Sequence, residues 1–220
     1  MMSTMTGTEV VGRRERKKLA TRAALSEAAL RLAVEHGVEH VTAEHIADEA
    51  DVAVRTFFNY FSSKEEAVVA GDLGTSGSLA AAFTERPRDE PLSDSLREAT
   101  LALVRGEEFR DRERVEQMRA VRRAPSLLPH RLAAYAEQEQ ALTDAVASRT
   151  GSDVEHDVLP ALAAATAMAA MRVAVLRWLN HGVDEVDRPG LVELVEDVFA
   201  HLASGLDDGV SSGRAGSVAG

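Results

Sequence analysis

Apolar residues recur at every third or fourth position along most of the chain, the spacing that gathers them on one face of an α-helix. A sustained alternation of apolar and polar residues, which would indicate β-strands, is not found. The pattern therefore predicts an all-α protein. A first helix should cover 14–36 and end at Gly37. Its apolar positions are Leu19, Ala23, Leu30, Ala33 and Val34.

Shorter helices are predicted to follow directly. Thr42 is suited to cap the helix "AEHIADEA", because its hydroxyl can accept hydrogen bonds from backbone amides that have no partner in the first turn. The residues "DVA" interrupt this helix, and a third helix is predicted over 53–60. Ser62 and Ser63 precede two glutamates, which is typical of a helix start, so a fourth helix should begin there.

The third helix has two contrasting faces. Four of the nine aromatic residues of the chain lie within it or directly after it. At 100° per residue, its apolar face consists of Val54, Phe57, Phe58 and Phe61. The opposite face consists of Arg55, Thr56, Asn59 and Tyr60. We expect the rings to anchor the helix, leaving the polar face free to donate to phosphate oxygens or base edges. Two short helices arranged in this way form a helix-turn-helix.

Charge is distributed unevenly along the chain. The formal net charge of −11 argues against a polyanionic partner, but residues 1–64 hold nine basic and nine acidic residues, so the surplus lies in 65–220. The cluster "RRERKK" occupies 13–18. Because charges more than about 8–10 Å apart are screened at physiological salt, this cluster can bind a polyanion locally. A solvated run of charges at a chain end is the alternative interpretation.

Several classes of function are disfavoured. The absence of cysteine excludes disulfides, thiolate metal sites and cysteine nucleophiles, and no catalytic or nucleotide-binding motif is found, so neither an enzyme nor a cofactor is predicted. The spacing of His36, His40 and His45 does not indicate a shared metal. The N-terminus lacks the apolar stretch of a signal peptide, and the apolar segment 161–179 carries two arginines. We therefore expect no membrane partner and a cytoplasmic location.

The segment "VTAEHIADEADVAVRTFFNYFSSKEEAVVA" resembles the DNA-binding signature of TetR-family transcriptional regulators. The family pattern of threonine, Ile-Ala, turn, aromatic recognition helix and Ser-Lys-Glu start is matched in order and spacing by Thr42, 46–47, 50–52, 56–61 and 63–65. The resemblance covers about 14–70. It implies an N-terminal three-helix helix-turn-helix domain followed by a larger helical ligand-binding and dimerisation domain.

By this resemblance the chain is expected to be a dimeric, ligand-responsive repressor that a small molecule releases from a palindromic operator. Arg55 and Asn59 match positions that face bases in the major groove. Thr42, Thr56, Tyr60 and Lys64 match positions that bind phosphate. Arg13, Arg14 and Lys17 resemble the basic arm before the first helix. From the residues alone, Thr42 could serve only as a cap and Asn59 could be only a solvated helix residue.

The sequence departs from the family pattern at three positions. Asp51 replaces the turn glycine, but aspartate tolerates the left-handed conformation better than most residues, so the turn should form. Ala53 cannot cap the third helix, which removes roughly 1 kcal/mol of stabilisation. Phe58 replaces a common tyrosine and lacks the hydroxyl that often reaches phosphate.

Further helices are predicted beyond the segment 71–77, "GDLGTSG", which should interrupt or loosen the fourth helix and serve as a hinge. They begin at Ser93, run through "RDRERVEQMRAVRRAP", continue from "PHRL" to Gly151, and then cover 153–181 and 189–207. The boundaries predicted are 1–12 for a flexible tail, 13–70 for the DNA-binding domain, 71–208 for the effector and dimerisation domain and 209–220 for a disordered tail.

The last two helices carry the features expected of a dimer interface or of the protomer's own core. Residues 161–175 are rich in alanine, and the final helix has an apolar stripe. The stripe consists of Leu191, Leu194, Val195, Val198, Phe199 and Leu202. The candidate effector-binding residues are Met118, Arg122, Met168, Met171 and Trp178; the apolar ones are equally suited to a plain core. A helical-bundle interaction module that reads no DNA is the alternative function.

Overall fold

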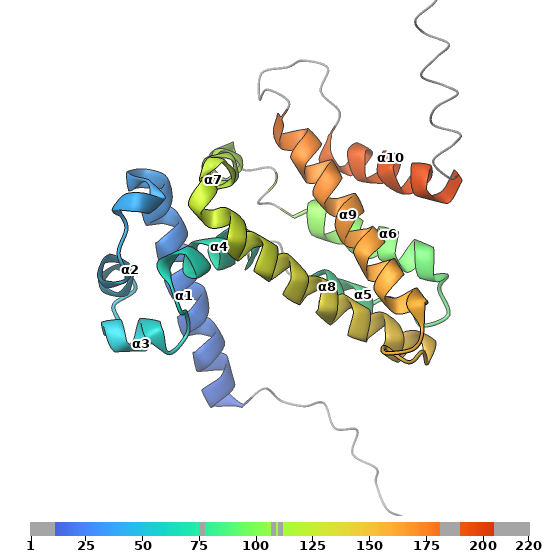
Figure 1. Ribbon diagram of the computed structural model, residues 1–220, viewed down its shortest axis with the longest axis horizontal. Coiled ribbons are helices and arrows are strands. Elements are labelled where there is room, and N and C mark those ends of the chain that lie inside the picture. The colour runs from blue at the N-terminus through green and yellow to red at the C-terminus, as the bar shows by residue number, and fades with distance from the viewer. Residues whose placement is uncertain (1–11, 75–77, 107–108, 110–111, 181–189, 205–220) are drawn as a thin grey trace, which may run out of the picture. The chain divides into compact units, whose positions relative to one another are not determined.

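The computed structural model describes residues 12–74, 78–106, 109, 112–180 and 190–204 (Figure 1). All regular structure in these residues is helical, which confirms the predicted all-α fold. The chain divides into two compact units, Met1–Gly74 and Thr75–Gly220. The predicted tails, 1–12 and 209–220, lie almost wholly outside the described residues. The functional boundaries proposed from the sequence stay a prediction.

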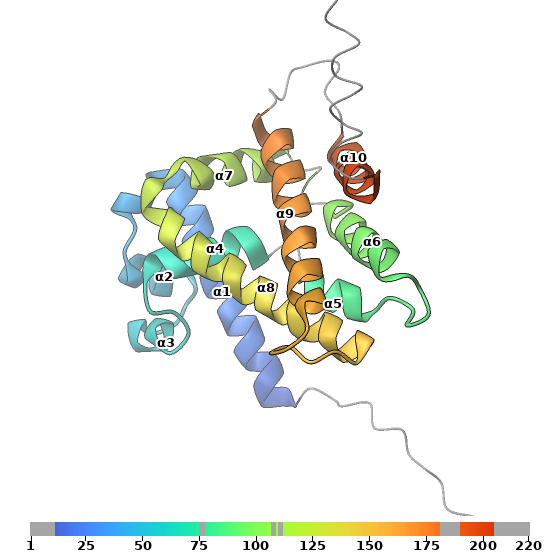
Figure 2. The same cartoon turned by 45° about the vertical axis from the view of Figure 1, so that its right-hand side comes forward.

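Within residues 12–74, the first unit contains four α-helices and one short 3₁₀-helix. They are α1 (Arg13–His36), η1 (Val38–His40), α2 (Ala43–Glu49), α3 (Val54–Phe58) and α4 (Lys64–Gly74). Helix α4 packs against α1, and α2 contacts both α1 and α3, so the two short helices sit side by side next to α1 (Figures 1 and 2). The third helix is shorter than the predicted 53–60.

The apolar face of α1 begins later than the sequence suggested. Leu30 and Ala33 are buried as predicted and Val34 is partly buried. Leu19, which is 56% exposed, and Ala23 face solvent, so the expectation for these two residues is wrong. The buried positions of α1 begin at Leu25, because only the second half of the helix packs against its neighbours. Most side chains of the N-terminal half are therefore exposed, and the guanidinium of Arg22 lies over the ring of Phe61.

Gly71 lies inside α4 and does not interrupt it, so the predicted break at 71–77 is wrong over 71–74. A Cβ atom added at Gly71 would stand 2.3 Å from the backbone oxygen of Ser26 and 2.9 Å from the Cβ of Leu30. Helices α1 and α4 thus approach each other too closely for any side chain at this position. The glycine serves the packing of the first unit.

The second unit consists of six α-helices and a 3₁₀-helix in its described residues. They are α5 (Leu79–Thr84), α6 (Leu92–Val104), α7 (Arg112–Arg123), η3 (Pro125–Leu127), α8 (Leu128–Thr150), α9 (Val158–Asn180) and α10 (Leu191–Ser204). Helices α7, α8 and α10 lie close to their predicted ranges, and Gly151 ends α8 in the left-handed conformation (φ 71°). Helix α5 was not predicted, and α6 begins at Leu92, one residue before the expected Ser93.

Helix α9 begins at Val158 and not at the predicted residue 153. The side chain of Asp153 accepts from the amide of Glu155, and its carbonyl accepts from the amide of Asp157 at 2.9 Å. These bonds hold a separate turn before the helix. Among the described helices, α9 has the length and composition of a membrane span, but it packs against α6, α8 and α10.

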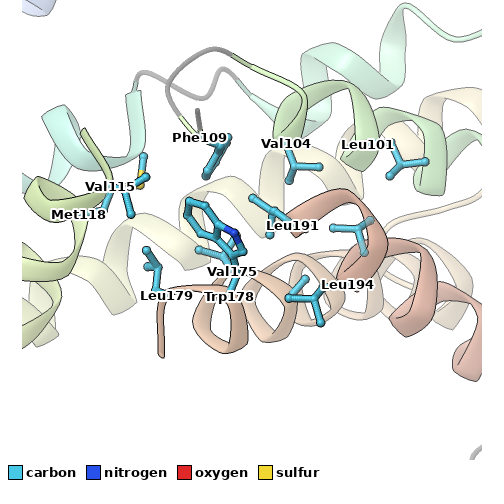
Figure 3. Close-up of a cluster of buried hydrophobic side chains, with 12 residues drawn as sticks. Leu101, Val104, Phe109, Val115, Met118, Val175, Trp178, Leu179, Leu191 and Leu194 are labelled. Atoms are coloured by element: carbon cyan, nitrogen blue, oxygen red, sulfur yellow. The ribbon is translucent and has the colours of Figure 1, made fainter. Parts of the chain in front are cut away.

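The core of the second unit has two hydrophobic clusters. The cluster shown in Figure 3, here called the tryptophan cluster, surrounds Trp178 with side chains from α6, α7, α9 and α10. Phe109 meets Trp178 edge-to-face, with ring centroids 6.0 Å apart. The second cluster joins α5, α6, α8 and α9 and includes Phe83, Leu142 and Met168.

The connection between α5 and α6 is held by Glu90. Its carboxylate accepts from Arg86 Nε at 2.9 Å and from the Ser95 hydroxyl at 2.6 Å. These bonds, that from Arg86 above all, lower the pKa of Glu90 from its ordinary value of 4.5 to about 2. The side chain of Arg149 ties the end of α8 to the same connection through the carbonyl of Glu90.

We expect Gly71→Ala to destabilise the first unit. Alanine gains about 1 kcal/mol over glycine in a helix, but overpacking against the backbone of α1 costs about 1–3 kcal/mol and should exceed that gain. Hydrogen exchange at the amides of α1 and α4 in the full chain measures the change in their opening free energy. Slower exchange in the variant would contradict the packing role of this glycine.

Candidate nucleic-acid interface

Helix α3 is fixed by two buried rings, not by the four apolar residues predicted. Phe57 and Phe61 are fully buried, with ring centroids 5.8 Å apart, and the guanidinium of Arg22 lies 4.8 Å from the centroid of Phe61. Val54 is partly buried. Phe58 is 57% exposed, so the prediction that it packs inward is wrong. The neighbouring helices do not reach the ring of Phe58, so this ring stays at the surface.

The turn before α3 forms as the sequence predicted. Asp51 adopts a left-handed conformation, with φ 52°, and the amide of Val52 donates to the carbonyl of Ala47 at 2.9 Å. This 6→1 hydrogen bond is typical of a Schellman motif at the end of a helix, in which the left-handed position is usually occupied by glycine. Ala53 provides no side-chain cap for α3, also as predicted.

The polar face of α3 shares a surface with α1. Arg55 and Asn59 are exposed, while Thr56 and Tyr60 are partly buried. An open hollow is lined on one side by Thr56, Asn59 and Tyr60 and on the other by residues of α1. The α1 residues are Arg14, Glu15, Lys17, Lys18 and Thr21. The structure therefore brings the basic cluster and the polar helix face together.

The basic residues belong to α1 itself. The helix begins at Arg13, so Arg13, Arg14 and Lys17 do not precede it, and the expectation of a separate basic arm is corrected for these residues. Arg13 and Arg14 lie in the first turn, where a cation opposes the positive end of the helix dipole by about 0.3–1 kcal/mol. Their presence there favours an external anionic partner over a stabilising role.

Lys18 and Thr21 also line the hollow but were not among the predicted site residues. Together with Arg14 and Lys17 they follow the spacing i, i+3, i+4 and i+7, which places all four on one face of α1. Applying the helical period to the polar residues of α1, as was done for the apolar ones, would have identified them.

Thr42 caps α2 as predicted. Its hydroxyl accepts from the amide of His45 at 3.3 Å. The pKa of the neighbouring Glu44 carboxyl is lowered, first by a hydrogen bond from its own backbone amide and then by one from Thr42. The hydroxyl therefore has partners in the free protein, and its predicted phosphate contact stays a prediction.

Ser63 and Glu66 open α4. The amide of Glu66 donates to the Ser63 hydroxyl at 3.1 Å, and the Glu66 carboxylate accepts from the amide of Ser62 at 2.7 Å. This reciprocal arrangement satisfies amides at the start of the helix. The predicted helix start is confirmed.

Lys64 is held inside the first unit. Its ammonium donates to three carbonyl oxygens, those of Val38 at 2.9 Å, Glu39 at 3.4 Å and Val41 at 2.8 Å. The side chain is 22% exposed. These bonds join the first turn of α4 to the chain that leads into α2. The phosphate contact expected of Lys64 stays a prediction. In the free protein, its ammonium binds backbone carbonyls of the first unit.

The candidate effector residues are divided between the two clusters of the second unit. Met118 and Trp178 are buried in the tryptophan cluster, and Met171 packs against it, whereas Met168 belongs to the second cluster. Arg122 lies one turn after Met118 on α7 and is partly buried. Its Nε atom is buried and has no hydrogen-bond partner among the described residues.

The histidines singled out from the sequence line another open hollow of the first unit. His36, His40 and His45 are accompanied there by three carboxylates. Within the described residues, no group of three or more His, Cys, Asp or Glu side chains is arranged to hold a metal ion.

Two family models match the chain. Residues 25–70 match the model described as bacterial regulatory proteins, tetR family, and residues 90–207 match that of the MftR C-terminal domain. The chain belongs to the TetR family. It is a DNA-binding transcriptional regulator and not an enzyme.

Individual relatives agree with this assignment. The chain is 35% identical over 174 residues to the HTH-type transcriptional regulator TcmR of Streptomyces glaucescens, covering 76% of each chain. It is 28% identical over 193 residues to MftR of Mycobacterium tuberculosis, covering 87% of this chain and 94% of MftR. The solved structure of NalD from Pseudomonas aeruginosa shares the fold of this regulator, with a TM-score of 0.52, 21% identity and coverage of 84% of this chain and 96% of NalD.

Lys17 and Lys64 should respond differently to neutralisation. A lysine that binds phosphate releases counterions, so Lys17→Met should reduce the slope of log affinity against log salt by about 0.9 and leave stability unchanged. Lys64→Met should instead leave the slope unchanged and lower the free energy of unfolding by about 1–3 kcal/mol, because carbonyls lose a charged donor. Salt titrations of binding to calf-thymus DNA, with thermal melts of both variants, measure the two effects. An equal loss of slope in both variants would assign a phosphate contact to Lys64 as well.

Proposed function

We propose that the protein is a cytoplasmic, homodimeric repressor that binds a palindromic operator and is released from it by a small molecule. The observation that carries this proposal is the hollow shared by α1 and α3, where basic side chains face the polar side of a helix held by buried rings. NalD, which shares the fold, is the secondary repressor of the MexAB-OprM multidrug efflux pump. That precedent supports the repressing sense of control.

The two exposed residues of α3 are suited to read bases. Arg55 can donate bidentately to guanine, and Asn59 can pair with the edge of adenine in the major groove. The proposed phosphate contacts, which carry affinity but no sequence information, come from Thr42, Thr56 and Tyr60. Lys64, whose ammonium donates to backbone carbonyls, is assigned to the stability of the unit instead. Arg13, Arg14 and Lys17 bind backbone phosphates or an adjacent minor groove from α1.

A homodimer is supported by an uncovered apolar stripe on α9. Leu162, Val173 and Leu176 are exposed there, and the partly buried Ala165 and Ala169 lie between them on the same face. Small residues allow two helices to approach closely. On α10, Leu191, Leu194 and Val195 fill the protomer's own core, whereas Leu202 is exposed. We propose that these faces of α9 and α10 pair with a second copy, since helix-turn-helix dimers read half-sites about 34–36 Å apart.

The effector is proposed to be an amphiphile with an anionic head group. Met118, Met171 and Trp178 supply apolar surface, and Met168 extends it on α9. Buried polar atoms almost always have a partner, so the unsatisfied Nε of Arg122 supports a missing acceptor such as a carboxylate or phosphate. The effector acts by favouring a state in which the two recognition helices no longer match successive grooves, and its effect is limited by its differential affinity for the two states.

The alternative considered from the sequence, a helical module that reads no DNA sequence, would explain the second unit but not the match of residues 25–70 to the tetR-family model. A module without DNA recognition does not account for the exposed polar face of α3 or for the cations in the first turns of α1. The two functions differ in a direct way, because only the regulator discriminates between DNA sequences.

We expect Arg55→Ala to relax the base preference at one position of each half-site. Loss of a bidentate contact to guanine should cost about 1–3 kcal/mol on the preferred operator and much less on other sequences. Footprinting on the DNA upstream of the protein's own gene finds the operator and shows whether two half-sites are protected one helical turn apart. Binding to operator variants then measures the preference, with the exposed Arg88→Ala as control. An unchanged preference in Arg55→Ala would reject this reading residue, and equal binding of all sequences by the parent would overturn the proposed recognition of a specific operator.

The Arg122 proposal is tested with a chain-length series of fatty carboxylates. A ligand present at 100 times its Kd should stabilise the parent by about 2.7 kcal/mol and raise its melting temperature. Arg122→Gln should lose most of this shift, whereas Arg123→Gln, at the next and exposed position, should keep it. Operator release measured with the same ligands checks that binding is coupled to DNA affinity. Equal shifts in both variants would remove Arg122 from the effector site.

A further inference from the structure

Phe58 lies at the surface although water is a poor environment for a phenyl ring. It is 57% exposed, and Leu19 is the other large apolar residue of the described first unit with a comparable exposure. Burying a side chain of this size is worth about 1.5–3 kcal/mol. The free protein forgoes a large part of that gain at Phe58, which is expected where a ring is covered in a complex.

The exposed ring has a defined place. It meets Phe57 edge-to-face, with ring centroids 5.2 Å apart and an angle of 88° between the ring planes. Phe57 itself is fully buried and contacts Phe61. Phe58 therefore rests on the core of the unit through a chain of ring contacts, and its position is set by the same packing that holds α3.

Phe58 borders the polar face of α3 on the side away from α1. It follows Arg55 by three residues, so the two side chains are neighbours on the helix surface. At the other border, Thr56 and Tyr60 line the hollow shared with the basic residues of α1. Around the helix, the exposed face thus runs from the phenyl ring through Arg55 and Asn59 to the cationic side.

We propose that Phe58 is a specificity-determining residue that contacts the 5-methyl group of a pyrimidine beside the base bound by Arg55. The inference rests on the proposed function of α3. The ring has no hydrogen-bond donor for a phosphate or a base edge. Among the base edges of the major groove, the methyl group of thymine is the apolar feature, and 5-methylcytosine carries the same group. Contact removes both the ring and the methyl from water, which makes a methylated pyrimidine favourable at this position.

The test replaces each operator thymine in turn by deoxyuridine, which removes only the methyl group. At one thymine in each half-site, the replacement should weaken binding of the parent about fourfold, the effect of one lost buried methyl group. Phe58→Ala should bind the unmodified operator more weakly and should be insensitive to the same replacement. A double-mutant cycle of ring and methyl group therefore gives a coupling of about fourfold.

A second pair of operators separates the methyl group from the rest of the base. The contacted T·A pair is changed to C·G and, in parallel, to 5-methylcytosine·G. The parent should prefer the methylated member of this pair by about fourfold, and Phe58→Ala should bind both equally. Phe58→Leu, which keeps an apolar side chain, should retain part of the preference. Thermal melts of each variant confirm that the fold is intact, as expected for an exposed residue.

The outcomes are distinct. If no thymine responds to loss of its methyl group in the parent, or if Phe58→Ala responds as strongly as the parent, the proposed methyl contact is overturned while operator binding stands. If the parent protects no operator at all, the proposed function fails and this inference fails with it.

Discussion

The burial of Phe57 and Phe61 is the constraint on which the DNA-binding unit depends. Helix α3 has only five residues, far fewer than the roughly 12–15 that an isolated helix needs to be marginally stable in water. Its conformation is therefore supplied by packing, since each fully buried ring contributes about 1.5–3 kcal/mol. Every side chain on the outer face takes its position from these two rings, from the left-handed Asp51 before them and from the Ser63 cap after them.

The division of charge complements this local arrangement. The first 64 residues are neutral overall but carry five of their nine cations in the cluster at 13–18, whereas the rest of the chain holds the whole acidic surplus. Screening confines the attraction for phosphate to the surface around α1 and α3. An acidic surplus elsewhere weakens unspecific adhesion to nucleic acid, because the remaining surface repels a polyanion. Such a protein relies on correctly placed contacts more than on overall charge.

The features that could be predicted from the sequence are those with local causes. Thr42, Asp51 and Ser63 act on backbone groups within a few residues, so the cap, the turn and the start of α4 could be derived from spacing alone. The recognition signature at 42–65 likewise gave the fold class. These elements need no knowledge of the rest of the chain.

The errors concern residues whose environment is set by distant parts of the chain. Phe58 and Leu19 fit an apolar helical period, but neighbouring helices do not reach them. The partners of Lys64 are carbonyls 23–26 residues away in the sequence. Gly71 is required because the backbone of α1 lies too close for a side chain. Neither contact can be recognised from the sequence alone. Assigning the effector residues was limited in the same way, because methionine and tryptophan suit a core and a ligand site equally.

The bonds of Lys64 have a practical consequence for chemical labelling. The chain has three lysines, and Lys17 and Lys18 are exposed while the ammonium of Lys64 is engaged by backbone carbonyls. Reagents that acylate lysine side chains will consequently modify the two residues beside the hollow shared by α1 and α3 first. A fluorophore attached through amine chemistry would cover that surface, so optical reporters are better placed through a cysteine introduced into this cysteine-free protein.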